Sequence, residues 1–404
     1  VAQPGVPILS FNSPQGDSVA VSQQRFFLSP SSKAENAQSW TVPVCVKAIG
    51  GKENCEVLSA AQQSLKVPQA PFFFANAEGK GYYRSAYPAD VYAKIVDNVE
   101  TGLTPEERIS LLGDAWAQVR ADKISVGDYL NLAAAVKDDT SAAVIQTALN
   151  AVGAIDNTIA NTDDEHEALA AWVRRNFKPA YERLGEASDS DMPEKKQLRA
   201  TLFGYLGTIG KDPDVIAQAR QIAEKYLADP SSVEGTFAQT ATGIAAINGD
   251  AAFFDQLQKV FETSTNPQLQ ESALRLLARF KDQSLAHRTL EYTVSGKVRN
   301  QDAPIELMLM LQGRETRDQA WQYIQQNWDK VQAQLTTWGG GAVITGTGSL
   351  CSAEARDQVV SFFAAHKVHA SERTLQQAKN RINDCIELRA AQEPKLKEWM
   401  ATQK

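Results

Sequence analysis

Beyond residue 88 the sequence is dominated by helical patterns that continue almost to its end. The first strong helix start is Thr104-Pro105-Glu106-Glu107, where a capping threonine precedes a proline, and a glutamate stands three residues after the cap. One face of this predicted helix carries Ile109, Leu112, Trp116 and Val119. Because such patterns fill most of the chain, they constrain it to a mainly α fold.

Further start and stop signals divide this region into many short helices. They are Asp212-Pro213, Asn248-Gly249-Asp250, Asn266-Pro267, Asp302-Ala303-Pro304, Ser352 and Ser371. Helices of about 10–18 residues joined by short polar turns favour stacked helical hairpins, and no strict repeat period is present. We therefore predict an irregular α–α superhelix of the HEAT/ARM-like solenoid kind over residues 88–404, with an extended groove on its concave face.

Residues 1–87 have a different pattern, typical of short strands. Trp40, Val42, Val44 and Val46 alternate with more polar residues, which is the period-two signal of a half-buried strand. Other predicted strands cover 19–28, 64–67, 72–74 and 81–87. Their spacing and the Gly, Pro, Asn and Ser residues between them predict a small β-sandwich domain over residues 1–87.

Composition excludes several classes of function. The net charge of −7 is mild and no basic run stands out, so nucleic acid is not an expected partner. The densest apolar runs, such as Ile305–Leu311, fall short of the roughly 20 residues that span a bilayer. Residue 1 is valine and no signal peptide follows, so we expect that the chain was processed or cut from a longer one.

The four cysteines suggest two pairs. Cys45 and Cys55 flank a probable hairpin turn centred on Gly50, and directly opposite strand positions suit a disulfide. Cys351 and Cys385 each border a predicted helix. The alternative is four buried thiols, which a thiol count under denaturing conditions would reveal. If the pairs form, the compartment is oxidising, so the sequence favours a periplasmic or secreted, bacterial-like protein.

The sequence offers no convincing catalytic metal site. Catalytic zinc needs three protein ligands, and only four histidines exist, His166, His287, His366 and His369. The pair His366 and His369 could clip a metal, but it falls near a helix end without an obvious third ligand. Asp164-Glu165-His166-Glu167 is better explained by acidic residues in the first turn of a helix. We therefore expect no metal and no cofactor in this chain.

Other candidate features favour structural roles. There is no Gly-x-Ser-x-Gly elbow for a nucleophilic triad, so no catalytic residue is predicted. Gly339–Gly341 and Thr345–Gly348 lack the context of a phosphate-binding loop and predict a flexible connection between helices. Trp321 and Trp328, seven residues apart, predict one buried helical face. Glu306 is interpreted as compensating a helix dipole.

Several motifs in a fixed order carry a resemblance to a known family. They are Gln3-Pro4-Gly5-Val6-Pro7-Ile8-Leu9, Gly81-Tyr82-Tyr83-Arg84-Ser85-Ala86-Tyr87, Val298-Arg299-Asn300-Gln301-Asp302, Ala320-Trp321, Asn327-Trp328 and the run from Cys351-Ser352 to Phe362-Phe363. Together they resemble the C-terminal half of the aminopeptidase N family, the gluzincin zinc metallopeptidases, over nearly the whole chain. The resemblance implies a sandwich followed by a helical bowl, with the zinc-binding His-Glu-x-x-His in a catalytic domain upstream of residue 1.

The resemblance also implies roles for particular residues. Arg84 is expected to tie the sandwich to the helices, with substrate contact as the alternative; where the family continues with Val-Asn-Tyr, this chain has Ser85-Ala86-Tyr87. Arg299 or Gln301 would face the cavity and bind a peptide backbone or C-terminal carboxylate. The alternative is that this segment only provides Asp302 as a helix cap. Some extracytoplasmic relatives carry a disulfide where Cys351 and Cys385 stand.

The leading hypothesis is therefore a non-catalytic region that forms the lid and wall of the peptide chamber of a zinc aminopeptidase. Its partners would be the upstream catalytic domain of the same polypeptide and peptide substrates. The alternative is a stand-alone HEAT-like scaffold that binds peptides or proteins without peptidase activity. A third, weaker possibility is an independent hydrolase with a site in the groove. The reading frame upstream of Val1 would discriminate between the first two.

Overall fold

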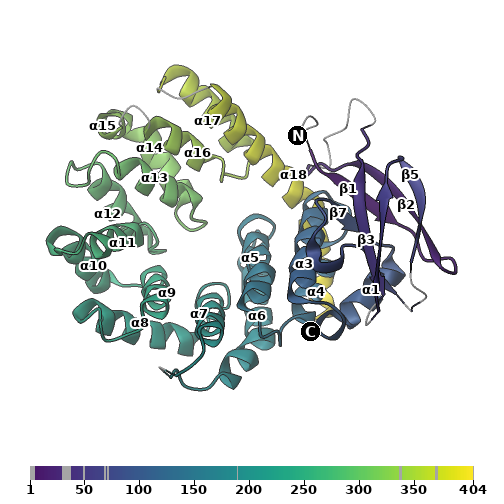
Figure 1. Cartoon of the computed structure of the whole chain (residues 1–404). Coiled ribbons are helices and arrows are strands. Elements are labelled where there is room, and N and C mark those ends of the chain that lie inside the picture. Colours follow the sequence, from purple (N-terminus) through teal and green to yellow (C-terminus); the bar gives the residue numbers. More distant parts are fainter. Residues whose placement is uncertain are drawn as a thin grey trace. The chain divides into compact units, whose positions relative to one another are not determined.

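The structure is a computed structural model that describes residues 5–29, 38–48, 51–67, 70, 72–188, 190–335, 339–368 and 372–403 (Figure 1). The chain separates into two compact units. Unit 1 holds Val1–Ala168, Arg175–Leu202 and Ala390–Lys404, and unit 2 holds Leu169–Arg174 and Phe203–Arg389. The strands end at Ala86 and the first α-helix begins at Ala89, while the predicted domain boundary at residues 87 and 88 stays a prediction.

Unit 1 begins with two small sheets that confirm the predicted β-sandwich. The strands are β1 (Pro7–Phe11), β2 (Ser18–Arg25), β3 (Val42–Ala48), β4 (Glu53–Leu58), β5 (Gln62–Lys66), β6 (Phe73–Phe74) and β7 (Arg84–Ala86). One sheet has the order β5-β2-β1-β7 and the other β4-β3-β6. Val42, Val44 and Val46 of β3 are all buried, as their alternation predicted. Phe11 of β1 and Phe73 of β6 join the two sheets through rings 5.7 Å apart.

The open edge of β7 is covered by side chains of helix α3 (Pro105–Arg120). The Ser85 backbone N–H donates to Asp114 Oδ2 over 2.9 Å, and Gln118 Nε2 donates to the Ser85 carbonyl over 3.1 Å. An uncovered strand edge is a template for unwanted pairing, and here two polar side chains complete its hydrogen bonds instead. The helix is thereby fixed to the sandwich.

The other helices that lie wholly in unit 1 after the strands are α1 (Ala89–Asp97), α2 (Val99–Gly102), α4 (Val126–Ala135) and α5 (Ala142–Thr158), with a 3₁₀ turn at Ala77–Gly79 before them. Helices α6 (Asp163–Arg183) and α7 (Pro193–Thr208) contribute residues to both units. Thr104 and Glu107 form the predicted capping box of α3. Thr162 and Glu165 do the same for α6, which confirms that the acidic run there belongs to a helix start.

The final helix, α18 (Glu372–Thr402), ends inside unit 1. Gln392 is fully buried there, accepts the Val126 backbone N–H over 2.9 Å and donates to the carbonyls of Val119 and Ile124. A buried amide satisfied on both sides fixes the helix in one register. The C-terminal turns therefore belong to the core of the unit that contains the N-terminal strands.

Unit 2 is built from helices that confirm the predicted start signals. They are α8 (Pro213–Ala228), α9 (Gly235–Ile247), α10 (Ala251–Thr263), α11 (Pro267–Leu277), α12 (Gln283–Thr293), α13 (Ala303–Gln312), α14 (Arg317–Gln326), α15 (Trp328–Gln334), α16 (Gly339–Thr347) and α17 (Ala353–Ala365). The side chains of Asp212, Asn266 and Ser352 cap α8, α11 and α17. Helix α8 packs on α9, and α10 packs on α11, as helical hairpins require. Ser371, the cap predicted for the last helix, lies outside the described residues.

The predicted flexible connection over Gly339–Gly341 and Thr345–Gly348 is wrong, because most of it forms helix α16. A Cβ atom on Gly339 would lie 2.7 Å from Pro304, and one on Gly346 would lie 2.9 Å from Leu311. Glycine is a poor helix former, but here it lets α16 approach α13 closely. Close packing thus outweighs the local cost of glycine.

Two smaller expectations also need correction. Trp321 and Trp328 are buried as predicted, but they lie in separate helices because α14 ends before Asn327. Cys385 lies within α18 instead of at its border. Among the described helices, none is both long enough and apolar enough to cross a bilayer.

Candidate functional site

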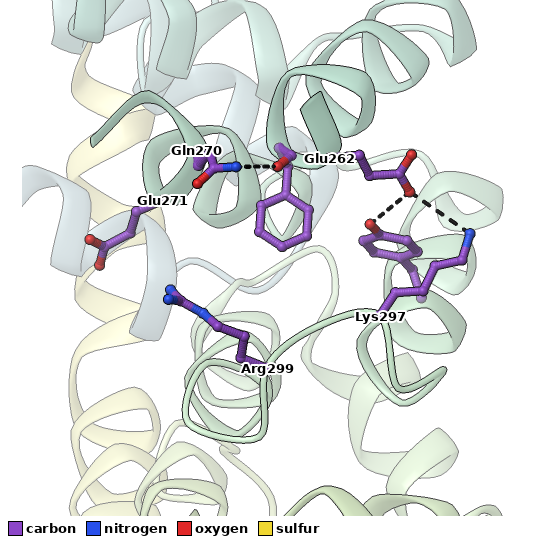
Figure 2. A pocket seen from close by; sticks show the side chains of 7 residues that line it. Glu262, Gln270, Glu271, Lys297 and Arg299 are labelled. Atoms are coloured by element: carbon purple, nitrogen blue, oxygen red, sulfur yellow. Dashed lines mark hydrogen bonds and ion pairs between the residues drawn. The ribbon is translucent and has the colours of Figure 1, made fainter. Parts of the chain in front are cut away.

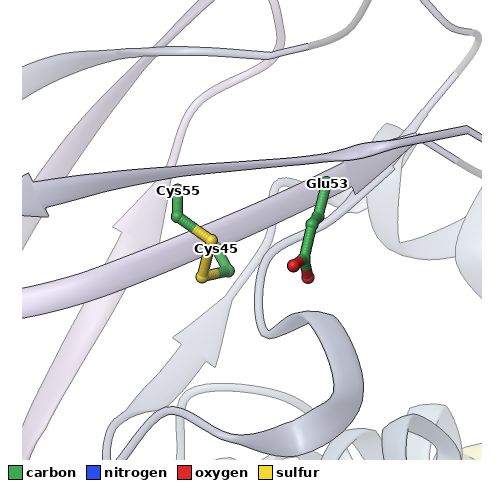
Figure 3. A group of neighbouring side chains, drawn as sticks. All are labelled: Cys45, Glu53 and Cys55. Carbon is green, nitrogen blue, oxygen red and sulfur yellow. A yellow bond between two sulfur atoms is a disulfide. The ribbon is translucent and has the colours of Figure 1, made fainter.

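Both predicted cysteine pairs are disulfides. Cys45 and Cys55 are direct partners in the β3–β4 register, with Cα atoms 4.0 Å apart, and Cys351 and Cys385 have Cα atoms 5.4 Å apart. Glu53 lies on the same side of β4 as Cys55 (Figure 3). These three residues are the one group of three metal-ligand side chains found among the described residues. Since both sulfur atoms are bonded to each other, they offer no thiolates to a metal.

The three histidines that the structure describes belong to different helices or helix ends. His166 Nδ1 lies 2.8 Å from Asp156, His287 lies on the exposed face of α12, and His366 ends α17 with its ring stacked on Phe362. His369 lies outside the described residues. A catalytic zinc site needs three converging ligands, and the described residues do not provide them. The described residues therefore do not fit the zinc that the resemblance implies.

Arg84 lies between the sandwich and helix α3, in the position expected for a tie. Its Nη1 atom is 3.1 Å from Asp114 Oδ1. Burial raises the pKa of Asp114 to about 7, against the opposing effects of the Ser85 N–H and Arg84. Tyr82 beside it is 84% exposed, whereas Tyr83 is buried and donates its hydroxyl to the Ala75 carbonyl over 2.6 Å. The geometry supports a structural role for Arg84.

Arg299 lies in a pocket of unit 2, with a volume of about 420 Å³. Helices α10, α11 and α12 and the segment between α12 and α13 supply its lining (Figure 2). The lining residues are Phe261, Glu262, Gln270, Glu271, Tyr292, Lys297 and Arg299. Gly296 has a φ of +83°, which turns the chain after α12. Val298, which stands between Lys297 and Arg299, is buried and anchors the segment in the hydrophobic core of unit 2.

One side of this pocket is aromatic and acidic. The Tyr292 hydroxyl donates to Glu262 Oε1 over 2.9 Å, and Lys297 Nζ lies 3.8 Å from the same oxygen. Hydrogen bonds from Gln258 and Tyr292 lower the pKa of Glu262, so it is ionised at neutral pH. Burial and the bond to Glu262 raise the pKa of Tyr292. The Phe261 and Tyr292 rings meet edge to face at 6.2 Å.

The other side of the pocket is held by a network of charges. Arg299 Nε lies 2.7 Å from Asp302 Oδ2. Arg275 Nη2 lies 3.5 Å from Asp302 Oδ1 and 3.5 Å from Glu271 Oε1. Arg275 also forms an ion pair with Glu306. Figure 2 shows Arg299 and Glu271 on one side and Lys297 and Glu262 on the other. A guanidinium bonded through Nε keeps its two amino groups for a carboxylate or a peptide carbonyl.

The network corrects one expectation about this segment. Asp302 occupies the position before α13, but its side chain does not cap the helix, because it binds Arg299 and Arg275 instead. Glu306 lies in the first turn of α13, where dipole compensation was expected, and it is also fully buried and ion-paired with Arg275. Burial raises the pKa of Glu306 to about 7. Gln301 is exposed and does not line the pocket.

Comparison with known proteins identifies the chain. Residues 72–384 match the ERAP1-like C-terminal domain. This chain belongs to the ERAP1-like C-terminal domain family. The match includes the whole helical part of the pocket described above, from α10 to the segment before α13.

Relatives of this ERAP1-like chain are named as aminopeptidases. It is 24% identical to "Aminopeptidase 2, mitochondrial" of Saccharomyces cerevisiae over 94% of this chain and 40% of that protein. It is 24% identical to the "Alanine/arginine aminopeptidase" of the same yeast, over 94% and 45%, and 25% identical to "Aminopeptidase M1" of Arabidopsis thaliana, over 94% and 46%. The chain thus spans less than half the length of these relatives and corresponds to their C-terminal part.

Sequence reasoning found Arg299 but missed its partners in the pocket. The missed partners come from three different places: Glu262 from α10, Tyr292 from α12 and Lys297 from the segment after α12. No spacing in the sequence indicates that these side chains lie close together. The one available signal was Gly296-Lys297-Val298-Arg299, where a glycine turn and a buried valine present two cations.

Proposed function

We propose that this chain is the non-catalytic C-terminal region of a zinc aminopeptidase and forms the lid and wall of its peptide-binding chamber. Zinc and the general base of hydrolysis would belong to a catalytic domain of the same polypeptide, where zinc polarises the scissile carbonyl and activates water. Family membership supports the aminopeptidase context. The residues of this chain would bind and orient the substrate.

The observation that carries this proposal is the pocket around Arg299. The Arg299 side chain is 65% exposed, and its described contact with Asp302 is made through Nε. It lies beside the aromatic and acidic side of the pocket. A planar cation with two amino groups available is well suited to a peptide carboxylate or backbone carbonyl. Peptides combine such groups with side chains that aromatic rings can contact.

Replacing Arg299 tests this function. We expect Arg299→Gln to weaken peptide binding to this chain by about tenfold, because a charged hydrogen bond to the peptide is lost. Isothermal titration of a short unblocked peptide would measure the change. The matched control is Arg373→Gln, which removes an exposed arginine from α18 in the same unit and should leave affinity unchanged. Equal affinities for wild type and Arg299→Gln would contradict the proposal.

A further inference from the structure

One corner of the pocket already holds a cation that belongs to the protein itself. Lys297 Nζ lies 5.8 Å from the centroid of the Tyr292 ring and 3.8 Å from Glu262 Oε1. An aromatic face beside a carboxylate is a well-matched environment for an ammonium or guanidinium group. The corner formed by Phe261, Glu262 and Tyr292 is therefore a receptor for a cationic side chain, and Lys297 is its present occupant.

The receptor is fixed, but its occupant is held weakly. Glu262 Oε1 accepts hydrogen bonds from the Tyr292 hydroxyl over 2.9 Å and from Gln258 Nε2 over 3.1 Å, and the Phe261 ring stands at 86° to that of Tyr292. The Lys297 side chain is instead 64% exposed, and its Nζ atom lies 3.8 Å from Glu262 Oε1, which is a long distance for an ion pair. Exposed ion pairs of this kind contribute little, so another cation can take the place of Lys297 at small cost.

The chain around Lys297 leaves room for such an exchange. Ser295 and Gly296 before it are exposed, and a Cβ atom placed on Gly296 would meet no atom within 4 Å. Val298 after it is buried, so the backbone is anchored while the lysine stem can turn outward. Exchanging one cation for another leaves the charge of the corner unchanged, so Glu262 keeps a positively charged partner.

We propose that the corner of Phe261, Glu262 and Tyr292 selects a lysine or arginine side chain of the bound peptide, which displaces Lys297 from Glu262. This inference rests on the proposed function, because Arg299 on the other side of the pocket would bind the peptide's carboxylate or backbone. It adds a preference for a basic residue to peptide binding. Lys297 then acts as a competitor that keeps the corner satisfied until such a peptide binds.

Two peptides that differ in one side chain test this inference. Both would be titrated into the 404-residue chain at low ionic strength, one ending in lysine and the other in norleucine, which keeps the aliphatic stem and lacks the charge. We expect the lysine peptide to bind about three- to tenfold more tightly. Lys297→Met should raise affinity for the lysine peptide more than for the norleucine peptide, because only the charged side chain competes with Lys297 for Glu262. Glu262→Gln should remove the difference between the two peptides.

The matched control is Lys330→Met, an exposed lysine of α15, which should alter neither affinity. Equal binding of both peptides to the wild type, or weaker binding of the lysine peptide to Lys297→Met, would overturn the inference. In either case the proposed function would stand if both peptides still bound and still required Arg299. If neither peptide bound at all, the proposed function and the inference would fail together.

Discussion

At the scale of single residues, two buried carboxylates account for much of how the helices are tied. Asp114 joins α3 to β7, and Glu306 joins α13 to Arg275 of α11. Burial raises the pKa of each to about 7. The unfolded chain releases the Asp114 proton near pH 3.8, whereas the folded chain keeps it up to about pH 7. The contribution of Asp114 to stability is therefore full below about pH 4 and is lost as the pH rises to 7.

This gives a prediction for Asp114→Asn. An amide does not titrate, so the variant should lose part of the decline in thermal stability that the wild type shows between about pH 4 and pH 7. We expect the difference in that decline to be about 2–5 °C in the unfolding midpoint, followed by calorimetry. Asp97→Asn, at an exposed position of α1, is the control and should keep the wild-type decline. An identical pH dependence in Asp114→Asn and wild type would contradict this account.

At the scale of helices, the close approach of α16 to α13 depends on missing side chains. A Cβ atom on Gly346 would lie 2.9 Å from the Leu311 side chain and 3.1 Å from the Met308 Cα atom, whereas one on Gly341 in the same helix would meet nothing within 4 Å. The same substitution by alanine is therefore expected to have opposite effects on stability at the two positions.

Alanine substitutions test this packing directly. Gly346→Ala should destabilise unit 2 by about 1–3 kcal/mol, because the added methyl group forces α16 away from α13. Gly341→Ala should be neutral or stabilising by up to about 1 kcal/mol, because alanine favours helix. Urea unfolding of both variants followed by circular dichroism would separate the two effects. Equal stability of the two variants would show that the helices do not need this contact.

These elements also show what the sequence could and could not predict. Capping residues announced most helix starts, because a cap acts on backbone groups within three residues of itself. The glycines of α16 led to the wrong prediction of a flexible connection. They are needed for packing against α13, which lies more than 25 residues earlier in the chain. Of the residues that line the pocket, only Arg299 was predicted. Glu262 and Glu271 come from α10 and α11, which meet through packing that no local sequence pattern indicates.

At the scale of the molecule, the two ends of the chain share one unit. Residues 390–404 belong to unit 1, where Trp399 Nε1 donates to Asn131 over 3.0 Å and its ring lies against Gly127, 2.7 Å from the position of a Cβ there. The unit that contains the sandwich therefore needs the last turns of α18.

A chain ending at Arg389 should lose order in unit 1 while unit 2 keeps it. Hydrogen exchange would show this as faster exchange of amides in α3 and α4 with little change in α10 and α11, because only unit 1 loses Gln392 and Trp399. A chain ending at Thr402 should exchange like the full one. Equal acceleration in both units would argue against the division described here.

The proposed function requires that this chain binds peptide without cleaving it. The most direct measurement is equilibrium dialysis of the 404-residue chain with an unblocked peptide and excess zinc, followed by mass spectrometry of the retained peptide. We expect the chain to retain the peptide and to leave it at its original mass. A product shortened by its N-terminal residue, formed at a rate that scales with the amount of chain, would contradict the proposed function.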